Sequence, residues 1–351
     1  MISWRRSMLA LSALGCVLPQ AGGGQPAALP TWERLPSIPD RVGFAGSFAG
    51  VHERTLLVAG GANFPDKAPW EGGTKVWHDR VFALTPGASA WREIGHLPMA
   101  NGYGVSISTP EGVLLIGGGD ARGNFAEVTR VRLVEGSAVV DSLPALPLPL
   151  AMAAGALVGR TVYVAGGVDD PAATRAQSVF LALDLDDTDS GWQRLESWPG
   201  PARMLATAAA LDGTFYLVGG AGLHAGPDGK PVRDWLLDAY AYTPSLGWKR
   251  LADLPRPVVA APSPAPTVRG RVLVLGGDDG SQLITPPTSH PGFPRSVLAY
   301  ETTTGTWHEA GTLPFSLVTT SAILTSECVI IPGGEARPGV RSTEAWRARL
   351  P

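Results

Sequence analysis

The stretch Thr55-Leu56-Leu57-Val58-Ala59-Gly60-Gly61 decides the fold of this chain, because its outline recurs five more times. Each copy is a short apolar run that ends in two glycines. The six doublets are Gly60-Gly61, Gly117-Gly118, Gly166-Gly167, Gly219-Gly220, Gly276-Gly277 and Gly333-Gly334, and their first glycines are 57, 49, 53, 57 and 57 residues apart. A repeat of about 50 residues is typical of the four-stranded blade of a kelch-type propeller. The sequence therefore predicts an all-β, six-bladed β-propeller.

The strands of one blade, and the closure of the ring, follow from this pattern. In blade 1 we expect strands at 44–51, 55–59, 80–85 and 91–94. A tryptophan opens the fourth strand in four blades, and packing between blades is the expected role of Trp91, Trp192, Trp248 and Trp307. The last doublet is followed by only one strand, at 343–350, so residues 31–36 are expected to supply the missing fourth strand. The N-terminal strand then pairs into the C-terminal blade, which removes an open edge.

The composition narrows the class of protein. The 351 residues carry a net charge of −3, and 17% of them are charged, with no basic run of the kind that binds nucleic acid. Residues 1–24 resemble a secretory signal peptide, with Arg5-Arg6 ahead of a short apolar stretch. The arginine pair is typical of twin-arginine export, and Cys16 leaves a lipid anchor as an alternative. We expect a periplasmic or secreted propeller over residues 30–351, without a membrane-spanning segment.

The long connections gather on one face of the predicted ring. Strands in a blade alternate in direction, so the connections between second and third strands emerge on the same side as the links between blades. The long ones are at 62–79, 221–236, 278–294 and 335–342, in the neighbouring blades 1, 4, 5 and 6. Loops at one end of a rigid scaffold are the usual place for a ligand site, so a pocket is expected there.

Glu335 and Arg341 are the sharpest candidates for chemistry on that face. Glu335 directly follows the last doublet, and Pro338-Gly339 can turn the chain so that Arg341 comes back beside it. A carboxyl group at a channel mouth can act as a general acid/base, and a guanidinium can hold a carboxylate. The alternative is a surface ion pair without function, which is common.

The segment Gly334-Glu335-Ala336-Arg337-Pro338-Gly339-Val340-Arg341 resembles the Gly-Glu-x-(Lys/Arg)-Pro-Gly-x-Arg motif of the N-acetylneuraminate epimerase family, the bacterial sialic acid mutarotases. Further stretches at 43–46, 60–64, 103–106 and 114–118 are similar to blades of that family. The stretches at 154–164 and 199–220 resemble the family's first and second blades, so the blade order is rotated. The chain, over roughly residues 30–350, therefore resembles the cyclically permuted mutarotases.

This resemblance implies an isomerase that interconverts the anomers of N-acetylneuraminate or a related acidic sugar without a cofactor. Glu335 would be the general acid/base, and Arg341 would bind the sugar carboxylate or polarise the reacting oxygens. Two other interpretations stay open. A propeller can bind a glycan or a protein through the same loops without catalysis, or it can be another isomerase or lyase-like enzyme for an acidic sugar. The sequence does not indicate the oligomeric state.

Other polar residues on the predicted loop face are weaker candidates for substrate binding, and each could equally be structural. They are Arg41, Asn63, Trp70, Lys75, Asn101 and Arg203. Trp70 could stack on a sugar ring or anchor its own loop. The loop histidines His78 and His290 lack the spacing of metal ligands, so no metal site is expected. The sequence also lacks a phosphate loop and a dinucleotide-binding fingerprint.

Overall fold

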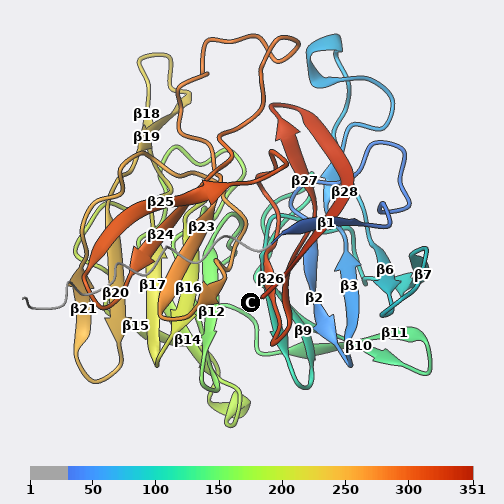
Figure 1. The fold of residues 1–351 in the computed structure, drawn as a ribbon, viewed down its shortest axis with the longest axis horizontal. Coiled ribbons are helices and arrows are strands. Elements are labelled where there is room, and N and C mark those ends of the chain that lie inside the picture. Colours follow the sequence, from blue (N-terminus) through green and yellow to red (C-terminus); the bar gives the residue numbers. More distant parts are fainter. Residues whose placement is uncertain (1–30, 351) are drawn as a thin grey trace, which may run out of the picture.

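The computed structural model describes residues 31–350, and the predicted leader at 1–24 lies outside them. These residues form six four-stranded antiparallel sheets arranged around a central channel (Figure 1). The chain is thus a six-bladed β-propeller, as the glycine doublets predict. Each blade runs outward from the channel in chain order, except the last, whose outer strand comes from the N-terminal end.

The strands of the six blades, from the channel outward, are as follows. Blade 1 holds β2 (Phe48–His52), β3 (Thr55–Ala59), β6 (Arg80–Leu84) and β7 (Arg92–His96); blade 2 holds β8 (Val105–Thr109), β9 (Gly112–Ile116), β10 (Val128–Val134) and β11 (Ser137–Leu143); blade 3 holds β12 (Ala154–Val158), β13 (Thr161–Ala165), β14 (Phe180–Asp184) and β15 (Gln193–Leu195). Blade 4 holds β16 (Thr207–Leu211), β17 (Thr214–Val218), β20 (Ala239–Thr243) and β21 (Gly247–Arg250); blade 5 holds β22 (Thr267–Val268), β23 (Arg271–Leu275), β24 (Ser296–Glu301) and β25 (Thr306–Thr312); blade 6 holds β26 (Ile323–Leu324), β27 (Cys328–Arg337), β28 (Val340–Arg349) and β1 (Trp32–Leu35).

In five of the six blades, the glycine doublet joins the blade to the next through a backbone hydrogen bond. Both glycines of every doublet have positive φ, which side chains rarely tolerate. A Cβ on Gly60 would also lie 2.3 Å from the carbonyl oxygen of Asn101 in the next blade. Gly61 N–H donates to that same carbonyl oxygen at 2.8 Å, and the doublets of blades 2, 3, 4 and 6 make equivalent bonds. The repeated Gly-Gly pair is therefore needed for close approach between blades.

A closed circle of six backbone hydrogen bonds surrounds the channel. Each link that leads into an inner strand contributes one residue: Gly46, Tyr103, Met152, Leu205, Ala260 and Thr319. The N–H of each residue donates to the carbonyl oxygen of the residue before it in this circle, at 2.7–2.8 Å. All six have φ between 53° and 65°, a strained value for the five that are not glycine. Because blade 1 enters this circle at Gly46, its inner strand begins at Phe48 and not at residue 44 as predicted.

Apolar side chains fill the spaces between neighbouring blades, as the tryptophan pattern predicts. One buried cluster joins Val105 and Leu114 of blade 2 to Val162 and Leu181 of blade 3. The four repeated tryptophans each donate their indole N–H to a carbonyl oxygen at the outer end of the preceding blade: Trp91 to Pro36, Trp192 to Pro144, Trp248 to Glu196 and Trp307 to Ala252.

The N-terminal strand closes the ring. β1 pairs antiparallel with β28, with Trp32 opposite Ala348 and Leu35 opposite Ala345. The Trp32 ring also stands edge-on to Phe315, with ring centroids 5.0 Å apart. This pairing confirms the closure expected from the missing fourth strand of blade 6.

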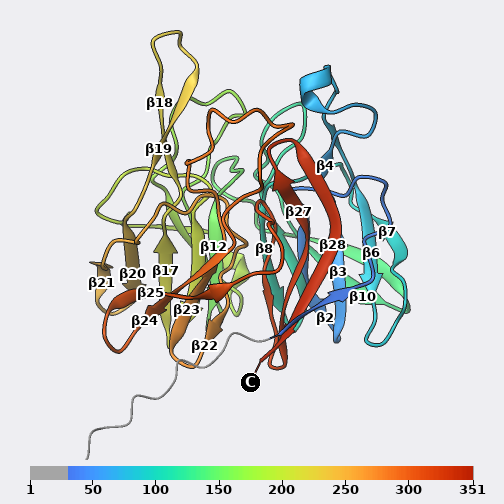
Figure 2. The same ribbon diagram turned by 45° about the horizontal axis from the view of Figure 1, so that its top comes forward.

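The elaborate connections project from one side of the ring (Figures 1 and 2). The blade 1 connection contains β4 (Ala62–Asn63), β5 (Val76–Trp77) and a 3₁₀ turn at Pro69–Glu71, and the blade 4 connection is the hairpin of β18 (Ala221–Ala225) and β19 (Pro231–Trp235). A further 3₁₀ turn, Thr188–Ser190, lies in blade 3.

The predicted loop at 335–342 is not a loop. β27 and β28 continue through it as one long hairpin that turns at Pro338-Gly339, so β28 begins at Val340 rather than at residue 343. Within residues 31–350, no helix is long and apolar enough to cross a membrane.

Candidate active site at the channel mouth

Two acidic residues occupy equivalent backbone positions in neighbouring blades, next to the circle of hydrogen bonds around the channel. In every blade, the residue directly after the doublet pairs through the backbone with the residue just before a member of the circle of hydrogen bonds. The six residues that follow the doublets are Ala62, Gly119, Val168, Ala221, Asp278 and Glu335. Asp278 in blade 5 and Glu335 in blade 6 are the carboxylic acids of this set. Burial raises the pKa of Asp278 above its ordinary value. Asp278 was not among the residues predicted from the sequence, although alignment of the six repeats on their glycine doublets places it opposite Glu335.

The long hairpin of blade 6 brings Glu335 and Arg341 together, as the Pro-Gly turn predicts. The two residues are direct partners across the β27–β28 ladder. Arg341 Nη1 donates to Glu335 Oε1 at 2.7 Å, and the Gly339 N–H donates to the same oxygen at 2.7 Å. The side chain of Arg341 is 6% exposed and that of Glu335 is 19% exposed, so the pair is largely buried. The glutamate is thereby held in one orientation by a guanidinium and a backbone amide.

Arg341 is also fixed on its other sides. Its Nε donates to the Ala62 carbonyl oxygen at 3.3 Å, and its guanidinium lies 5.1 Å from the centroid of the Phe64 ring. The blade 1 connection therefore supports the catalytic candidate of blade 6 across the junction where the ring closes.

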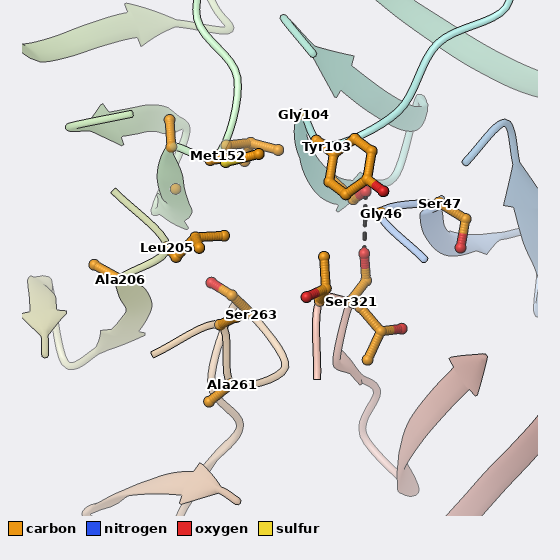
Figure 3. A pocket seen from close by; sticks show the side chains of 17 residues that line it. Gly46, Ser47, Tyr103, Gly104, Met152, Leu205, Ala206, Ala261, Ser263 and Ser321 are labelled. Carbon is orange, nitrogen blue, oxygen red and sulfur yellow. Dashed lines mark hydrogen bonds between the residues drawn. The ribbon is translucent and has the colours of Figure 1, made fainter. Parts of the chain in front are cut away.

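Tyr103 extends the cluster toward the channel, and sequence reasoning missed its role. It is the aromatic member of the circle of hydrogen bonds, and Figure 3 shows its ring among the residues that line the pocket at the centre of the propeller. Burial raises the pKa of Tyr103 to about 12, while the nearby charge of Arg341 acts in the opposite direction. Its hydroxyl is buried and lies near the Arg341 guanidinium, but among residues 31–350 it has no acceptor for its own proton. A buried donor of this kind is costly unless a ligand satisfies it.

Lys75, a predicted binding residue, lies against the same tyrosine. Its Nζ is 4.1 Å from the centroid of the Tyr103 ring and 4.7 Å from that of Trp77. Burial lowers the pKa of Lys75 to about 8; the charge of Arg341 adds to this decrease and that of Glu335 opposes it. Lys75 and Tyr103 line a cavity of about 440 Å³ on the loop face of blades 1 to 4. This volume is within the range of small-molecule sites.

Three other candidates, Arg203, Asn101 and Asn63, are held by contacts within the protein, and their role as binding residues stays a prediction. Arg203 is fully buried; it pairs with Asp238 at 2.6 Å and donates to the Gly219 carbonyl oxygen at 2.8 Å. Burial acts to raise the pKa of Asp238, but the hydrogen bond and charge of Arg203 outweigh it and lower that pKa. Arg203 therefore joins the link between blades 3 and 4 to the doublet and third strand of blade 4.

Asn101 and Asn63 have the same kind of role. Asn101 Nδ2 donates to the carbonyl oxygen of Gly117, the first glycine of the blade 2 doublet, at 3.0 Å. Asn63 is 1% exposed, and its amide bonds Asp40, the Gly43 carbonyl oxygen and His78. Both amide groups donate to backbone carbonyl oxygens near the junctions between blades, while the buried Oδ1 of Asn101 has no donor among residues 31–350.

Replacement of Arg203 by Met tests whether its buried ion pair with Asp238 stabilises the fold. We expect a loss of about 3–5 kcal/mol in the free energy of unfolding, because Asp238 would be left buried without its partner. Urea unfolding measures the change, and Arg194→Met, at an exposed position of β15, should alter stability by less than about 0.5 kcal/mol. Unchanged stability of Arg203→Met would show that this ion pair does not stabilise the fold.

Arg41 and Trp70 lie elsewhere on the loop face. Together with Phe64 and one side of Arg341 they line a second hollow of about 600 Å³, between the blade 1 connection and the β27–β28 hairpin. Arg41 is exposed, and Trp70 is 39% exposed. Both stay predictions as binding residues, but the structure places them apart from the cavity that Lys75 lines.

Comparison with known proteins agrees with this architecture. The family model of N-acetylneuraminate epimerase matches residues 27–140 and 143–284, which is roughly three quarters of the chain and ends before the hairpin of Glu335 and Arg341. The solved structure of YjhT superposes with a TM-score of 0.64 at 16% identity, covering 89% of this chain and 96% of that one. It shares the fold.

Relatives of known name are similar over shorter stretches. The N-acetylneuraminate epimerase of Yersinia enterocolitica is 29% identical over 237 residues, and that of Haemophilus influenzae strain PittEE is 27% identical over 241. These matches cover 60% and 61% of this chain and 58% and 61% of the relatives, so the chain spans about three fifths of the relatives that it matches. The protein of Yersinia pestis strain Pestoides F is 46% identical over 87 residues, about a fifth of either chain. On the strength of the family match, this chain belongs to the N-acetylneuraminate epimerase family.

Proposed function

We propose that this protein is a mutarotase that interconverts the anomers of N-acetylneuraminate or a closely related acidic sugar, with Glu335 as the general acid/base. The observation that carries the proposal is the buried Glu335–Arg341 pair beside the channel mouth. Family membership supports the choice of reaction and substrate.

The reaction requires only proton transfers. N-acetylneuraminate is a cyclic hemiketal; its ring opens when the anomeric hydroxyl loses a proton and the ring oxygen gains one. Rotation of the open keto form and reclosure on the opposite face then give the other anomer. A positioned carboxyl group can accept the first proton and return one, so the chemistry calls for no cofactor.

The geometry of Glu335 suits this task. Both hydrogen bonds that it accepts go to Oε1, from Gly339 and Arg341. Within residues 31–350, Oε2 accepts no hydrogen bond, which leaves one oxygen to exchange a proton with the sugar. Arg341 keeps the carboxyl group in place, and its positive charge stabilises negative charge that develops on a reacting oxygen.

Proton NMR of α-N-acetylneuraminate freshly released from a glycoside tests the proposal. With catalytic amounts of protein, the approach to the anomer equilibrium should be faster than the spontaneous rate, and the final ratio of anomers should be unchanged. An unchanged rate with perturbed ligand signals would favour the binding propeller instead. An unchanged rate and unperturbed signals would remove this sugar as a ligand.

We also propose that residues 1–24 direct export, so that the enzyme meets sialic acids outside the cytoplasm. The Arg5-Arg6 pair before an apolar stretch supports this. Recovery of the protein in the periplasm, with a mature N-terminus near residue 25, tests it; a cytoplasmic protein that keeps Met1 would contradict it.

A further inference from the structure

Lys75 is a cation without a counter-ion in the cavity at the channel mouth. Its ammonium group is held between the Trp77 and Tyr103 rings, which supply a favourable but neutral surface. Among residues 31–350 it forms no ion pair and donates no hydrogen bond, although Glu335 is near enough to influence its charge. Lys75 is half-buried, and an anionic ligand would compensate its unpaired charge.

Arg341 is less available to an anionic ligand than the sequence suggested. Its side chain is 6% exposed, and its guanidinium donates to Glu335 and to the Ala62 carbonyl oxygen and packs on Phe64. Binding a sugar carboxylate in a bidentate manner would require it to leave Glu335. The two cations beside Glu335 therefore have different roles: Arg341 orients the acid/base, and Lys75 is free to bind.

Acidic side chains line the part of the cavity near blades 2 and 3. Asp120 lines it and is paired with Arg122, and Asp170 lines it and accepts the Ala172 N–H. Arg233 lines it from the exposed β18–β19 hairpin. An anionic group is thus favoured at the Lys75 end, while carboxylates such as these are suited to accept hydrogen bonds from hydroxyl or amide groups.

We infer that Lys75 binds the carboxylate of an acidic sugar and thereby makes the enzyme select sugars that carry this group on the anomeric carbon. The inference rests on the proposed function. It also explains the orientation of the substrate: because the carboxylate is attached to the reacting carbon, seating it on Lys75 places that carbon beside Tyr103, at the end of the cavity where the charge of Glu335 acts on Lys75. The Tyr103 hydroxyl, which has no acceptor for its proton among residues 31–350, is then available to donate to the sugar.

Binding should weaken in alkaline solution. The ammonium form of Lys75 binds the anion, and because the pKa of Lys75 is lowered to about 8, the free protein loses this charge as the pH rises through 8. The groups that face Lys75 are Tyr103, Arg341 and Glu335, together with Asp120, Asp170 and Arg233 around the cavity. The pKa of Tyr103, about 12, keeps that group neutral over the same interval.

Calorimetric titration with N-acetylneuraminate and with its methyl ester tests the inference without relying on catalysis. Lys75→Met should raise the Kd for the acid by about 10- to 100-fold, the usual effect of losing a hydrogen bond between charged groups. The Kd for the neutral ester should change less than about threefold. Lys75→Arg should keep the affinity for the acid and abolish its decline above pH 8. Lys67→Met, in the same connection and exposed, is the matched control.

The outcomes separate this inference from the proposed function. Weaker binding of the acid by Lys75→Met, with no acceleration of anomer exchange by the unmodified protein, would support the carboxylate site and refute the mutarotase. Acceleration by the unmodified protein, with equal affinity of Lys75→Met for acid and ester, would overturn the role of Lys75. If the unmodified protein binds neither compound, the inference is wrong.

Discussion

Replacement of Glu335 by Gln is expected to lower the enzymatic acceleration of anomer exchange by about 10²–10⁴-fold, the usual contribution of a general acid/base. The amide has the same shape, and its carbonyl oxygen can still accept the hydrogen bonds of Gly339 and Arg341. It cannot take up or return a proton at the pH of the reaction. The rate is measured by proton NMR after subtraction of the spontaneous rate.

A second glutamate provides the matched control. Glu301 pairs with Arg271 across β23 and β24 at 2.6 Å, at the end of blade 5 away from the glycine doublet. Glu301→Gln removes a similar cross-strand ion pair but should retain the unmodified rate. Both variants should melt within a few degrees of the unmodified protein. A Glu335→Gln protein that keeps the full rate would show that the acid/base lies elsewhere, with Asp278 the next group to test.

Deletion of residues 31–37 is expected to cause the largest loss of stability. Trp32 and Leu35 are partly buried against their neighbours and would lose this packing, which costs up to about 3–6 kcal/mol. β28 would also become an open edge, and the Trp91 indole would lose the Pro36 carbonyl oxygen. For a propeller of this size we expect the melting temperature to fall by roughly 5–10 °C or more.

The exposed charges of β1 supply the control for this deletion. Glu33 and Arg34 pair with Arg347 and Glu344 at the surface, so Glu33→Gln and Arg34→Gln should each change stability by less than about 1 kcal/mol. Calorimetric melting of the deletion and of the two point variants makes the comparison. An unchanged melting temperature of the deletion would mean that β1 does not hold the ring closed.

The sequence predicted the ring well because its cause is local and repeated. Two adjacent glycines with positive φ are required at each junction, and no other residue pair could allow the approach seen at Gly60. Counting doublets therefore gave the number of blades. The unpaired last strand likewise indicated that Trp32–Leu35 would complete blade 6, as it does.

The candidate site could be predicted only in part, since the direction of a polar side chain in a link is not encoded locally. Arg203 and Asn101 occupy links on the correct face, yet both turn toward backbone carbonyls of the next blade. Lys75, from the same set of candidates, instead lines the cavity. Arg203 and Asn101 lie near backbone carbonyl oxygens that need a donor, and Lys75 does not. Which carbonyl oxygens need a donor depends on how the blades pack, and a local stretch of sequence does not show this.

Glu335 and Arg341 were expected to meet, but the form of their segment was not. The chain from Glu335 to Ser342 reads as a loop because it holds proline and glycine. In the structure, Pro338-Gly339 is a tight turn, and the residues on both sides extend the strands of blade 6. A rigid hairpin holds the pair more firmly than a loop would, and such rigidity favours catalysis.

The central claim is that this propeller exchanges the anomers of N-acetylneuraminate through Glu335. Two-dimensional exchange NMR on the equilibrated sugar tests it most directly, because spontaneous exchange is slow on that timescale and no release step is needed. The account predicts cross-peaks between the two anomers that grow with the concentration of the unmodified protein and vanish with Glu335→Gln. Spectra without cross-peaks at any concentration of the unmodified protein, or equal cross-peaks with Glu335→Gln, would contradict it.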